Sequence, residues 1–285
     1  MTRPDRPKGR QLHPSPPPIK DYLMHAYPKI PLFQPQKVST PECADVLKRF
    51  NPDFFLVAAY GEIIKQAILD IPRIGCINVH ASLLPKYRGA APIQRCLMAG
   101  DPISGVTLIS MTAQMDAGDI LAKEEIPIDD EMTAGELEKK LSELGAHLIL
   151  DVFEKCAQHQ ITRIAQDHSQ ATLAPKLTPE EEIIHWDQPA HTIHNLIRAL
   201  SPKPGAWAPV YLNGEKKRLK ILRSKWMDSS SGELPGAMIL FKEGRWLVAC
   251  GQGVLELLDV QLEGKKRLSS KEFIKGMNRP LSFLS

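Results

Sequence analysis

The sequence predicts an α/β domain with a mostly parallel sheet, followed by a small β-barrel. The stretch from Cys76 to His80 is short, mostly apolar and led in by Gly75, which is typical of a buried parallel strand. Helix-like and strand-like segments alternate around it, as they do in α/β domains. After Gly205 the pattern changes to short strand-like runs, separated by turns at Asn213-Gly214, Glu243-Gly244 and residues 251–253. This change predicts two domains.

Length and composition agree with a two-domain cytoplasmic protein. At 285 residues and 31.8 kDa, the chain is long enough for each domain to have its own core. The five cysteines are scattered, odd in number and without a CxxC pair, which favours reduced thiols over a disulfide framework or a zinc site. No apolar run approaches a membrane span, and the basic, proline-rich start does not resemble a secretion signal. We therefore expect a cytoplasmic monomer with no metal and no membrane contact.

Charge is unevenly distributed along the chain. The overall net charge is +3, but residues 176–285 carry 17 Lys and Arg against 12 Asp and Glu, whereas residues 1–175 carry 19 against 21. The second part is therefore net basic and the first part slightly acidic. A basic second half points to a polyanionic partner such as nucleic acid, and a merely soluble basic surface explains the charge equally well.

The elements before the central strand are expected to be short. Residues 1–18 are predicted to form no regular element, because their prolines block both helices and central strands. Thr40, Pro41 and Glu42 open a helix, with Thr40 as the N-cap and proline in the first turn. The elements expected here are a helix over 19–26, a strand over 30–33, a helix over 41–50, a buried strand over 54–59 and a helix over 64–69.

After the central strand we expect a helix over 91–99, a strand over 105–112 and a long helix. Thr133 and Glu136 form a capping-box pattern, which predicts a helix that starts there and runs to about Ala157. The apolar stripe of this helix is expected to be core rather than a binding surface; it comprises Leu137, Leu141, Leu144, Leu148 and Val152.

The segment that follows is polar and rich in turn residues, which is typical of a linker. We place the first domain at residues 1–160, the linker at 161–178 and the second domain at 179–285. An amphipathic helix is predicted over 188–200. Its His191 and His194 are spaced like a metal-binding pair but have no third ligand nearby, so we expect both to be solvated polar-face residues.

Three polar side chains fall where an α/β sheet places its ligands. Asn78 and His80 alternate on one strand, so they point to the same side about 7 Å apart, near its carboxyl end. Asp116 follows the next strand, in a loop that Gly118 makes flexible. An amide, an imidazole and a carboxylate at adjacent strand ends can stabilise an oxyanion, shuttle a proton and orient the shuttle. Asp119 is the rival carboxylate, and we prefer Asp116.

Two stretches carry a resemblance to a known family. Residues 76–95 read C-I-N-V-H-A-S-L-L-P-K-Y-R-G-A-A-P-I-Q-R, and residues 115–120 read M-D-A-G-D-I. Together they resemble the formyltransferase superfamily that uses 10-formyltetrahydrofolate and, within it, the methionyl-tRNA formyltransferases. The resemblance implies a Rossmann-like catalytic domain followed by an OB-like barrel. It also implies transfer of a formyl group from 10-formyltetrahydrofolate to the α-amine of methionine on initiator tRNA, with Asn78, His80 and Asp116 as catalytic residues.

The resemblance further implies which residues bind the two substrates. Backbone around Tyr60, Gly61 and Ile63 is expected to line the pterin pocket, and the turn formed by Ser82, Leu83, Leu84 and Pro85 is expected to contact the folate. The basic amino-terminal segment, with Arg6, Lys8 and Arg10, is expected beside the tRNA acceptor stem. Two basic clusters of the barrel are expected to contact phosphates; they comprise Lys216, Lys217, Arg218, Lys265, Lys266 and Arg267.

The start of the chain differs from the family pattern. Family members begin with a strand, a Gly-Thr-Pro turn and a helix, about thirty residues that are not seen before Met1, and the lack of that interior strand predicts two unpaired strand edges. Our interpretation is that Met1 is not the natural start. Two other functions remain open at this point. One is formyl transfer to a nucleotide sugar or to glycinamide ribonucleotide, and the other is tRNA or folate binding without catalysis.

Overall fold

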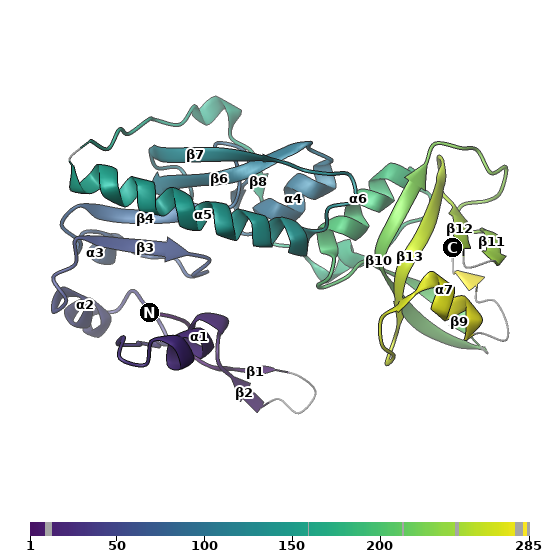
Figure 1. Ribbon diagram of the computed structural model, residues 1–285, viewed down its shortest axis with the longest axis horizontal. Helices are drawn as coiled ribbons and strands as arrows, with labels where there is room; N and C mark the ends of the chain where they lie inside the picture. Colours follow the sequence, from purple (N-terminus) through teal and green to yellow (C-terminus); the bar gives the residue numbers. More distant parts are fainter. Residues whose placement is uncertain (9–12, 159, 213, 243–244, 277–281, 284–285) are drawn as a thin grey trace.

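The computed structural model describes all residues except 9–12, 159, 213, 243–244, 277–281 and 284–285. Figure 1 shows two bodies side by side along the long axis. The first contains a four-stranded sheet with the long helix α5 (Ala134–Ala157) over one face, and the second is a strongly curled sheet. The helix α6 (Ala190–Leu200) lies where the two bodies meet.

The first sheet consists of β3 (Phe54–Ala58), β4 (Gly75–His80), β6 (Ile103–Ser110) and β7 (Ile120–Pro127), in that order. Only β3 and β4 are parallel; β6 is antiparallel to β4, and β7 is antiparallel to β6. The α/β class is confirmed, but the expectation of a mostly parallel sheet is wrong for the described strands. The connection from β6 to β7 is too short for a crossover helix and so returns the chain antiparallel. β6 is also antiparallel to β4 although a helix over residues 92–99 lies between them, so a helix between two strands does not by itself show that the strands are parallel.

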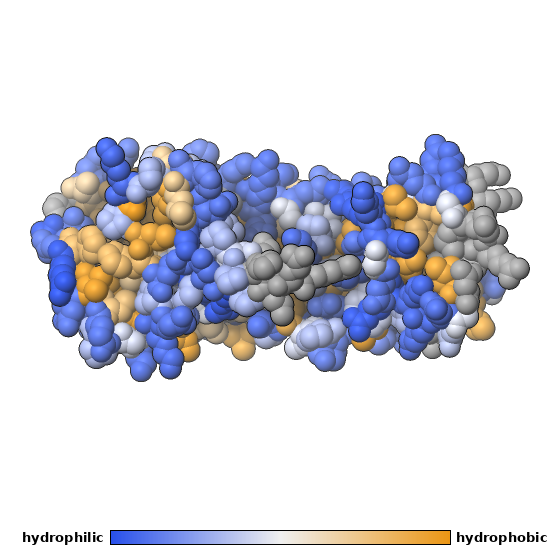
Figure 2. Space-filling model, turned by 90° about the horizontal axis from the view of Figure 1, so that it is seen from below, coloured by the Kyte–Doolittle hydropathy of each residue, from blue (hydrophilic) through white to orange (hydrophobic). Residues whose placement is uncertain are grey.

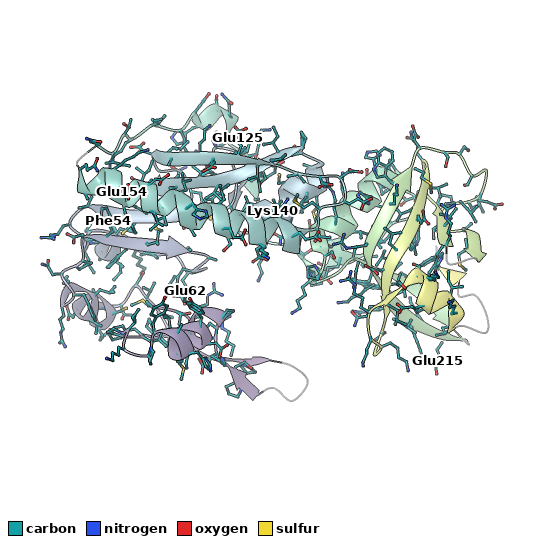
Figure 3. All side chains as sticks on the ribbon, viewed as in Figure 1. Phe54, Glu62, Glu125, Lys140, Glu154 and Glu215 are labelled. Atoms are coloured by element: carbon teal, nitrogen blue, oxygen red, sulfur yellow. The ribbon has the colours of Figure 1, made fainter. Side chains whose placement is uncertain are left out.

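The long helix α5 (Ala134–Ala157) supplies much of the first core. Thr133 Oγ1 accepts from Glu136 N and the Glu136 carboxylate accepts from Thr133 N, so the predicted capping box is present. The helix packs on the sheet through the expected stripe, of which Leu144 is only partly buried. Figure 3 shows Phe54 at the start of β3, close to α5, where its ring lies 5.4 Å from that of Phe153.

The amino-terminal segment contains regular structure that its prolines did not suggest. β1 (Arg6–Lys8) and β2 (His13–Ser15) form an antiparallel ribbon, with Pro7 opposite Pro14. The expectation of no regular element is therefore wrong. Each strand of a two-stranded ribbon has a free edge, so a proline, which has no N–H to donate, fits wherever the backbone nitrogen faces outward.

Three short helices follow this ribbon. They are α1 (Pro18–Ala26), α2 (Pro41–Lys48) and α3 (Gln66–Leu69). Thr40 Oγ1 accepts from Cys43 N, which confirms Thr40 as the N-cap of α2. The strand expected over residues 30–33 is absent, because this stretch pairs with no other described segment in a ladder.

The strand β3 lies at the edge of the described sheet rather than inside it. Leu56 is 47% exposed, which corrects the expectation of a buried strand. Figure 2 shows apolar residues gathered over the amino-terminal part of the molecule, at the left of the view. Exposed apolar side chains of this part include those of Tyr22, Met24, Phe50 and Ile63.

The segment between the two bodies is bound to the first one. β8 (Leu173–Ala174) pairs in parallel with β5 (Arg88–Gly89). Arg88 N donates to Thr172 O, and Ala91 N donates to Ala174 O, so the segment follows the loop after β4. It also contains the short 3-10 helices η1 (His168–Gln170) and η2 (Pro179–Glu182). The helix α4 (Pro92–Ala99) begins directly after the paired loop.

The second body is a seven-stranded sheet that curls into a half-barrel, which confirms the expected barrel-like second domain. Its core contains Trp246 and the apolar face of α6 (Ala190–Leu200). The strands run in the order β11-β12-β13-β10-β9-β15, with β14 beside β13. Their bounds, with those of α7, are β9 (Trp207–Leu212), β10 (Glu215–Met227), β11 (Met238–Lys242), β12 (Arg245–Ala249), β13 (Val254–Leu262), β14 (Leu268–Ser269), α7 (Ser270–Lys275) and β15 (Ser282–Phe283).

Polar contacts fix the two bodies to each other. His194 of α6 is 2% exposed; its Nε2 lies 2.8 Å from Asp130 O and its Nδ1 lies 3.0 Å from Ser224 Oγ. The expectation that His194 is solvated is therefore wrong, whereas His191 on the same helix is exposed. The side chains of Arg223 and Glu136 also form an ion pair between β10 and α5.

Two further findings concern the chain as a whole. All five cysteines are buried and free. Burial raises the pKa of Cys76 and of Cys96 to about 11, so these thiols are not nucleophiles at neutral pH. Among the helices that the structure describes, none is both long and apolar enough to cross a bilayer.

Candidate active site

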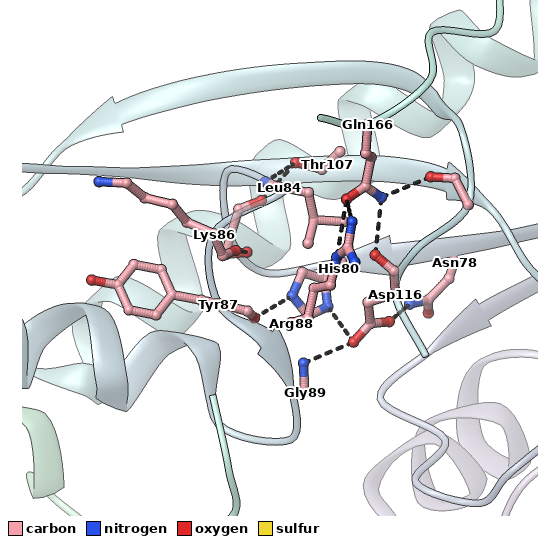
Figure 4. A network of polar contacts seen from close by, with 12 residues as sticks. Asn78, His80, Leu84, Lys86, Tyr87, Arg88, Gly89, Thr107, Asp116 and Gln166 are labelled. Atoms are coloured by element: carbon pink, nitrogen blue, oxygen red, sulfur yellow. Dashed lines mark hydrogen bonds and ion pairs between the residues drawn. The ribbon is translucent and has the colours of Figure 1, made fainter. Parts of the chain in front are cut away.

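Asn78, His80 and Asp116 meet at the end of β4. The strand ends at His80, and alternation places both β4 side chains on one side, as predicted. Asp116 reaches them by a different route from the one expected. Because β6 is antiparallel to β4, the chain at Met111 lies beside the start of β4, where Met111 N donates to Cys76 O. The loop then turns back and carries Asp116 to the other end of β4 (Figure 4).

The Asp116 carboxylate joins three segments of the chain. Its Oδ1 accepts from Asn78 Nδ2 at 3.3 Å, and its Oδ2 accepts from Gly89 N at 2.9 Å and lies 3.5 Å from His80 Nδ1. The side chains of His80 and Asp116 are 6% and 13% exposed. The rival, Asp119, makes no described contact with His80. The carboxylate therefore holds the amide and the imidazole in one arrangement that is shielded from water.

Both ring nitrogens of His80 have protein partners. Nε2 lies 2.9 Å from Tyr87 O, and a carbonyl oxygen only accepts, so this nitrogen carries a hydrogen. Nδ1 faces the Asp116 carboxylate, which is also an acceptor. The protonated imidazolium satisfies both contacts at once, and a neutral ring satisfies one of them. The ring is thus oriented to exchange a proton with Asp116 while the backbone of Tyr87 holds its far side.

The loop that carries Asp116 has a backbone conformation that few residue types can adopt. Asp116 has φ +50°, in the left-handed region that non-glycine residues rarely adopt. Two residues later, a Cβ on Gly118 would lie 1.7 Å from Ser110 O, so only glycine fits there. Gln166, which is 6% exposed, donates through Nε2 to Asp116 O at 2.9 Å and to Gly118 O at 2.7 Å.

A buried arginine completes this network. Arg88 is 6% exposed and donates to Gln166 Oε1 through Nη2 at 2.6 Å and through Nε at 3.2 Å. Its Nη2 also donates to His168 Nδ1 at 3.1 Å. Gln166 therefore lies between a donor-only side chain and two acceptor-only carbonyl groups, as Figure 4 shows.

The turn expected to contact folate is held by hydrogen bonds of its own residues and of Thr107. Ser82 and Leu84 are 1% exposed; Ser82 Oγ donates to Lys86 O at 2.7 Å, and Leu84 N donates to Thr107 Oγ1 at 3.1 Å. Thr107 Oγ1 in turn donates to Ser82 O at 2.7 Å. The polar groups of Ser82 and Leu84 thus hold the turn together, and Leu83 and Pro85 are its half-buried members.

The other stretch expected to contact folate follows β3. Gly61 is exposed and Ile63 is 87% exposed, whereas Tyr60 is half-buried. Arg3 Nε donates to Tyr60 O at 2.6 Å, and the Arg3 guanidinium lies against the Cα of Gly61, where a side chain would otherwise be. The Tyr60 hydroxyl is buried and has no hydrogen-bond partner among the described residues.

The basic residues expected to contact tRNA lie at two places. Arg6 is exposed on β1 and Lys8 ends that strand, while Arg10 lies outside the described residues. In the second domain, the cluster Lys216-Lys217-Arg218 starts β10, and the cluster Lys265-Lys266-Arg267 follows β13. These two clusters adjoin, because Glu263 N donates to Arg218 O at 2.9 Å. Lys217 pairs with Glu215 at 2.9 Å, and Arg218 stacks 4.5 Å from the Trp207 ring.

Comparison with known proteins identifies the family. The model of the Formyl transferase family matches residues 1–153, and that of the Formyl transferase, C-terminal domain matches residues 176–278. A methionyl-tRNA formyltransferase of Protochlamydia amoebophila (strain UWE25) is 46% identical over 285 residues, which is 100% of this chain and 89% of that protein. A second, of Syntrophomonas wolfei, is 43% identical over 97% of this chain and 86% of its own. The chain belongs to the methionyl-tRNA formyltransferase family.

Solved structures of similar fold accompany this family assignment. HypX from Aquifex aeolicus in complex with tetrahydrofolic acid has a TM-score of 0.62 at 19% identity, over 82% of this chain and 42% of HypX. WlaRD, a sugar 3N-formyl transferase, has a TM-score of 0.59 at 20% identity, over 77% of each chain. These likenesses concern the fold, and the family membership rests on the sequence matches.

Three residues of the candidate site were missed from sequence. Gly89 and Arg88 lie in the stretch that carried the resemblance, but nothing in their spacing shows that one binds Asp116 and the other Gln166. Gln166 lies 50 residues beyond Asp116, in a segment read as a polar linker. Among the described residues, no three His, Cys, Asp or Glu side chains group as a metal site would require.

Proposed function

We propose that the chain transfers a formyl group from 10-formyltetrahydrofolate to the α-amine of methionine on initiator tRNA. The observation that carries the proposal is the Asp116-centred arrangement of Asn78 and His80 at the end of β4, in a chain 46% identical to a methionyl-tRNA formyltransferase. The HypX complex with tetrahydrofolic acid supports a folate-type donor for this fold.

The reaction makes demands that these residues meet. The amine nitrogen attacks the formyl carbon, the bond from that carbon to N10 breaks, the amine loses a proton and N10 gains one. Negative charge develops on the formyl oxygen. Asn78 gives one amide hydrogen to Asp116 and keeps the other for this oxygen, a contact of a kind worth about 10²–10³ in rate.

His80 and Asp116 supply the proton path in this proposal. His80 faces Asp116 with Nδ1 and is held at Nε2 by Tyr87 O, so it is aligned with the carboxylate before substrate arrives. His80 donates to the formyl oxygen when Nε2 exchanges the Tyr87 carbonyl for it. Asp116 orients the ring and takes part in moving the amine proton towards N10, with water as carrier.

The substrates are assigned to the surfaces expected from sequence. The folate is proposed to lie between the backbone of Tyr60–Ile63 and the turn of residues 82–85, where exposed Ile63 would be covered. The tRNA is proposed to contact Arg6, Lys8 and Arg10 and the two adjoining basic clusters of the second domain. We keep the division at 1–160, 161–178 and 179–285, and a cytoplasmic monomer, as predictions.

The test is formylation of methionyl-tRNA by the purified chain, with 10-formyltetrahydrofolate as donor and initiator or elongator tRNA as acceptor. Preferential formylation of the initiator supports the proposal. Equal formylation of both tRNAs, or transfer only to a nucleotide sugar offered in parallel, would overturn the assigned acceptor. Binding of tRNA without transfer at any enzyme concentration would overturn catalysis itself.

A further inference from the structure

We infer that Gln166 is a positioning residue for Asp116, and that the segment between the domains thereby forms part of the active site. The inference rests on the proposed function, because it concerns how the catalytic carboxylate is held. Gln166 has no described hydrogen bond to the side chains of Asn78, His80 or Asp116. It acts on the backbone of the loop that carries one of them.

The Asp116 loop needs a support that its own sequence does not give. A residue at φ +50° is stable in that conformation only where surrounding groups hold it. The Gln166 amide group provides two such bonds, to the carbonyl oxygens on either side of Ala117. With both carbonyl groups fixed, the Cα of Asp116 is fixed, and so is the origin of its side chain.

The chemistry of the neighbours fixes which way the Gln166 amide group points. A guanidinium group only donates, so the side facing Arg88 must be the Gln166 oxygen. Backbone carbonyl groups only accept, so the side facing Asp116 and Gly118 must be the nitrogen. A reversed amide group would set donors against donors and acceptors against acceptors. Arg88 thus orients Gln166, and Gln166 holds the loop.

The same segment supports the partners of the carboxylate. β8 pairs with β5, and Thr172 Oγ1 accepts from Tyr87 N at 2.9 Å. Tyr87 O holds His80, and Gly89 N binds Asp116. Residues 166–174 therefore support the carboxylate through Gln166 and support its partners through the loop of residues 87–89. Figure 4 shows Gln166 and Gly89 on opposite sides of Asp116.

The informative substitution is Gln166→Glu. It keeps the shape and gives Arg88 a charged acceptor, so the attachment of the segment to the first domain is retained or strengthened. It replaces the amide nitrogen with an oxygen that faces two carbonyl oxygens, so the loop is repelled instead of held. If Gln166 only anchors the segment, Gln166→Glu is harmless. If Gln166 positions Asp116, the variant is folded and slow.

The experiment is single-turnover formylation of methionyl-tRNA, with KM for donor and tRNA measured in steady state. We expect Gln166→Glu to lower the rate of the chemical step at least tenfold, with both KM values within about twofold of the parent, because a displacement of about 1 Å is enough for such losses. The matched control is Gln160→Glu, the same change at the exposed residue directly before this segment, which should leave the rate unchanged.

A double-mutant cycle shows whether Gln166 acts through Asp116. In the Asp116→Ala background, adding Gln166→Glu should cost less than about twofold, because the group that Gln166 positions is already gone. A tenfold further loss there would overturn the inference, as would a parent-like rate for Gln166→Glu alone. An inactive parent protein would instead overturn the proposed function, so the two failures are distinct. A thermal unfolding curve checks that each variant is folded.

Discussion

At the residue scale, the site depends on one carboxylate with several donors. The two Asp116 oxygens receive hydrogens from Asn78 and Gly89 and face His80. A carboxylate can accept all of these contacts because both of its oxygens are acceptors, whereas an amide of the same shape offers one acceptor and adds donors. The arrangement therefore depends on the chemical identity of residue 116 more than on its size.

This dependence predicts the effect of Asp116→Asn. The new NH2 group must face either Gly89 N and the His80 ring or Asn78 Nδ2, all of which are donors in the native arrangement. We expect the turnover number to fall by about 10² or more while the melting temperature changes little. Asp119→Asn, three residues along the same loop, is the control and should retain most of the activity. Equal losses in both variants would show that the loop, not the carboxylate, matters.

The residues of this site differ in whether the sequence alone could predict them. Asn78 and His80 were predictable, because alternation on a strand fixes their common side without any knowledge of the fold. Asp116 was predictable as the acid of the next loop, but its path was not, since the antiparallel β6 carries the chain away before the loop returns it. The role of Gln166 could not be predicted, because its side chain donates to the backbone carbonyl of Asp116, 50 residues earlier, and such a contact leaves no pattern in the sequence.

At the element scale, periodic and capped segments followed expectation and proline-rich ones did not. The start of α5 was fixed by its capping box, and α2 by its Thr40 cap. The β1–β2 ribbon was missed because proline is excluded from the interior of a sheet, and a two-stranded ribbon has no interior. Pairing partners are a tertiary property, so the mixed order of the first sheet had no local signal.

The helix α6 predicts how stability depends on pH. Burial is the main cause that lowers the pKa of His194 below its ordinary value of 6.5; Asp130 and Glu131 oppose the shift and Arg198 adds to it. The unfolded chain thus binds this proton more readily than the folded one. The contribution is complete above pH 6.5 and is lost as pH falls below it, with a slope of at most about 1.4 kcal/mol per pH unit.

Urea unfolding between pH 7.5 and 5 measures this effect. Relative to the parent, His194→Gln should lose stability at pH 7.5 but show a flatter decline towards pH 5, because the variant has no buried imidazole to protonate. His191→Gln, on the exposed side of the same helix, should show the same pH dependence as the parent. A parent-like decline in His194→Gln would exclude His194 as the source.

At the scale of the whole molecule, positive charge is concentrated where the second domain presents two adjoining turns. The clusters at the start of β10 and after β13 lie side by side although nearly fifty residues separate them in the chain. Neither cluster alone is more than a solvated basic turn. Together they bring several cationic side chains to neighbouring turns, where Lys217 is paired with Glu215 and Arg267 with Asp259. We expect the other cations of the two clusters to provide the phosphate contacts.

The prediction for this surface concerns salt. The double variant Lys216→Ala/Lys266→Ala should weaken tRNA binding at low salt. It should also lower the slope of log K against log salt by about 1 for each phosphate that the variant no longer neutralises. Filter binding between 50 and 200 mM salt measures both quantities. Over this range, a protein with about six to ten phosphate contacts loses about 10³–10⁵ in affinity.

The control for this experiment is Lys140→Ala, because Lys140 is exposed on α5 in the other domain (Figure 3). It removes one positive charge from the molecule without touching either basic cluster, so its salt slope should match that of the parent. An unchanged slope in the double variant would remove these clusters from the tRNA interface.

The pairing of β8 with β5 also determines where the chain can be divided in a chimera or a split protein. In a chimera whose junction precedes Gln166, the first domain would lack Gln166 and its hydrogen bonds to the Asp116 loop. A junction after Ala174 would keep Gln166 and β8 together with the first sheet. We therefore expect the smallest fragment that supports catalysis to extend to Ala174, within the segment that the sequence predicts to be a linker, and a split protein to recover activity only if its first fragment extends that far.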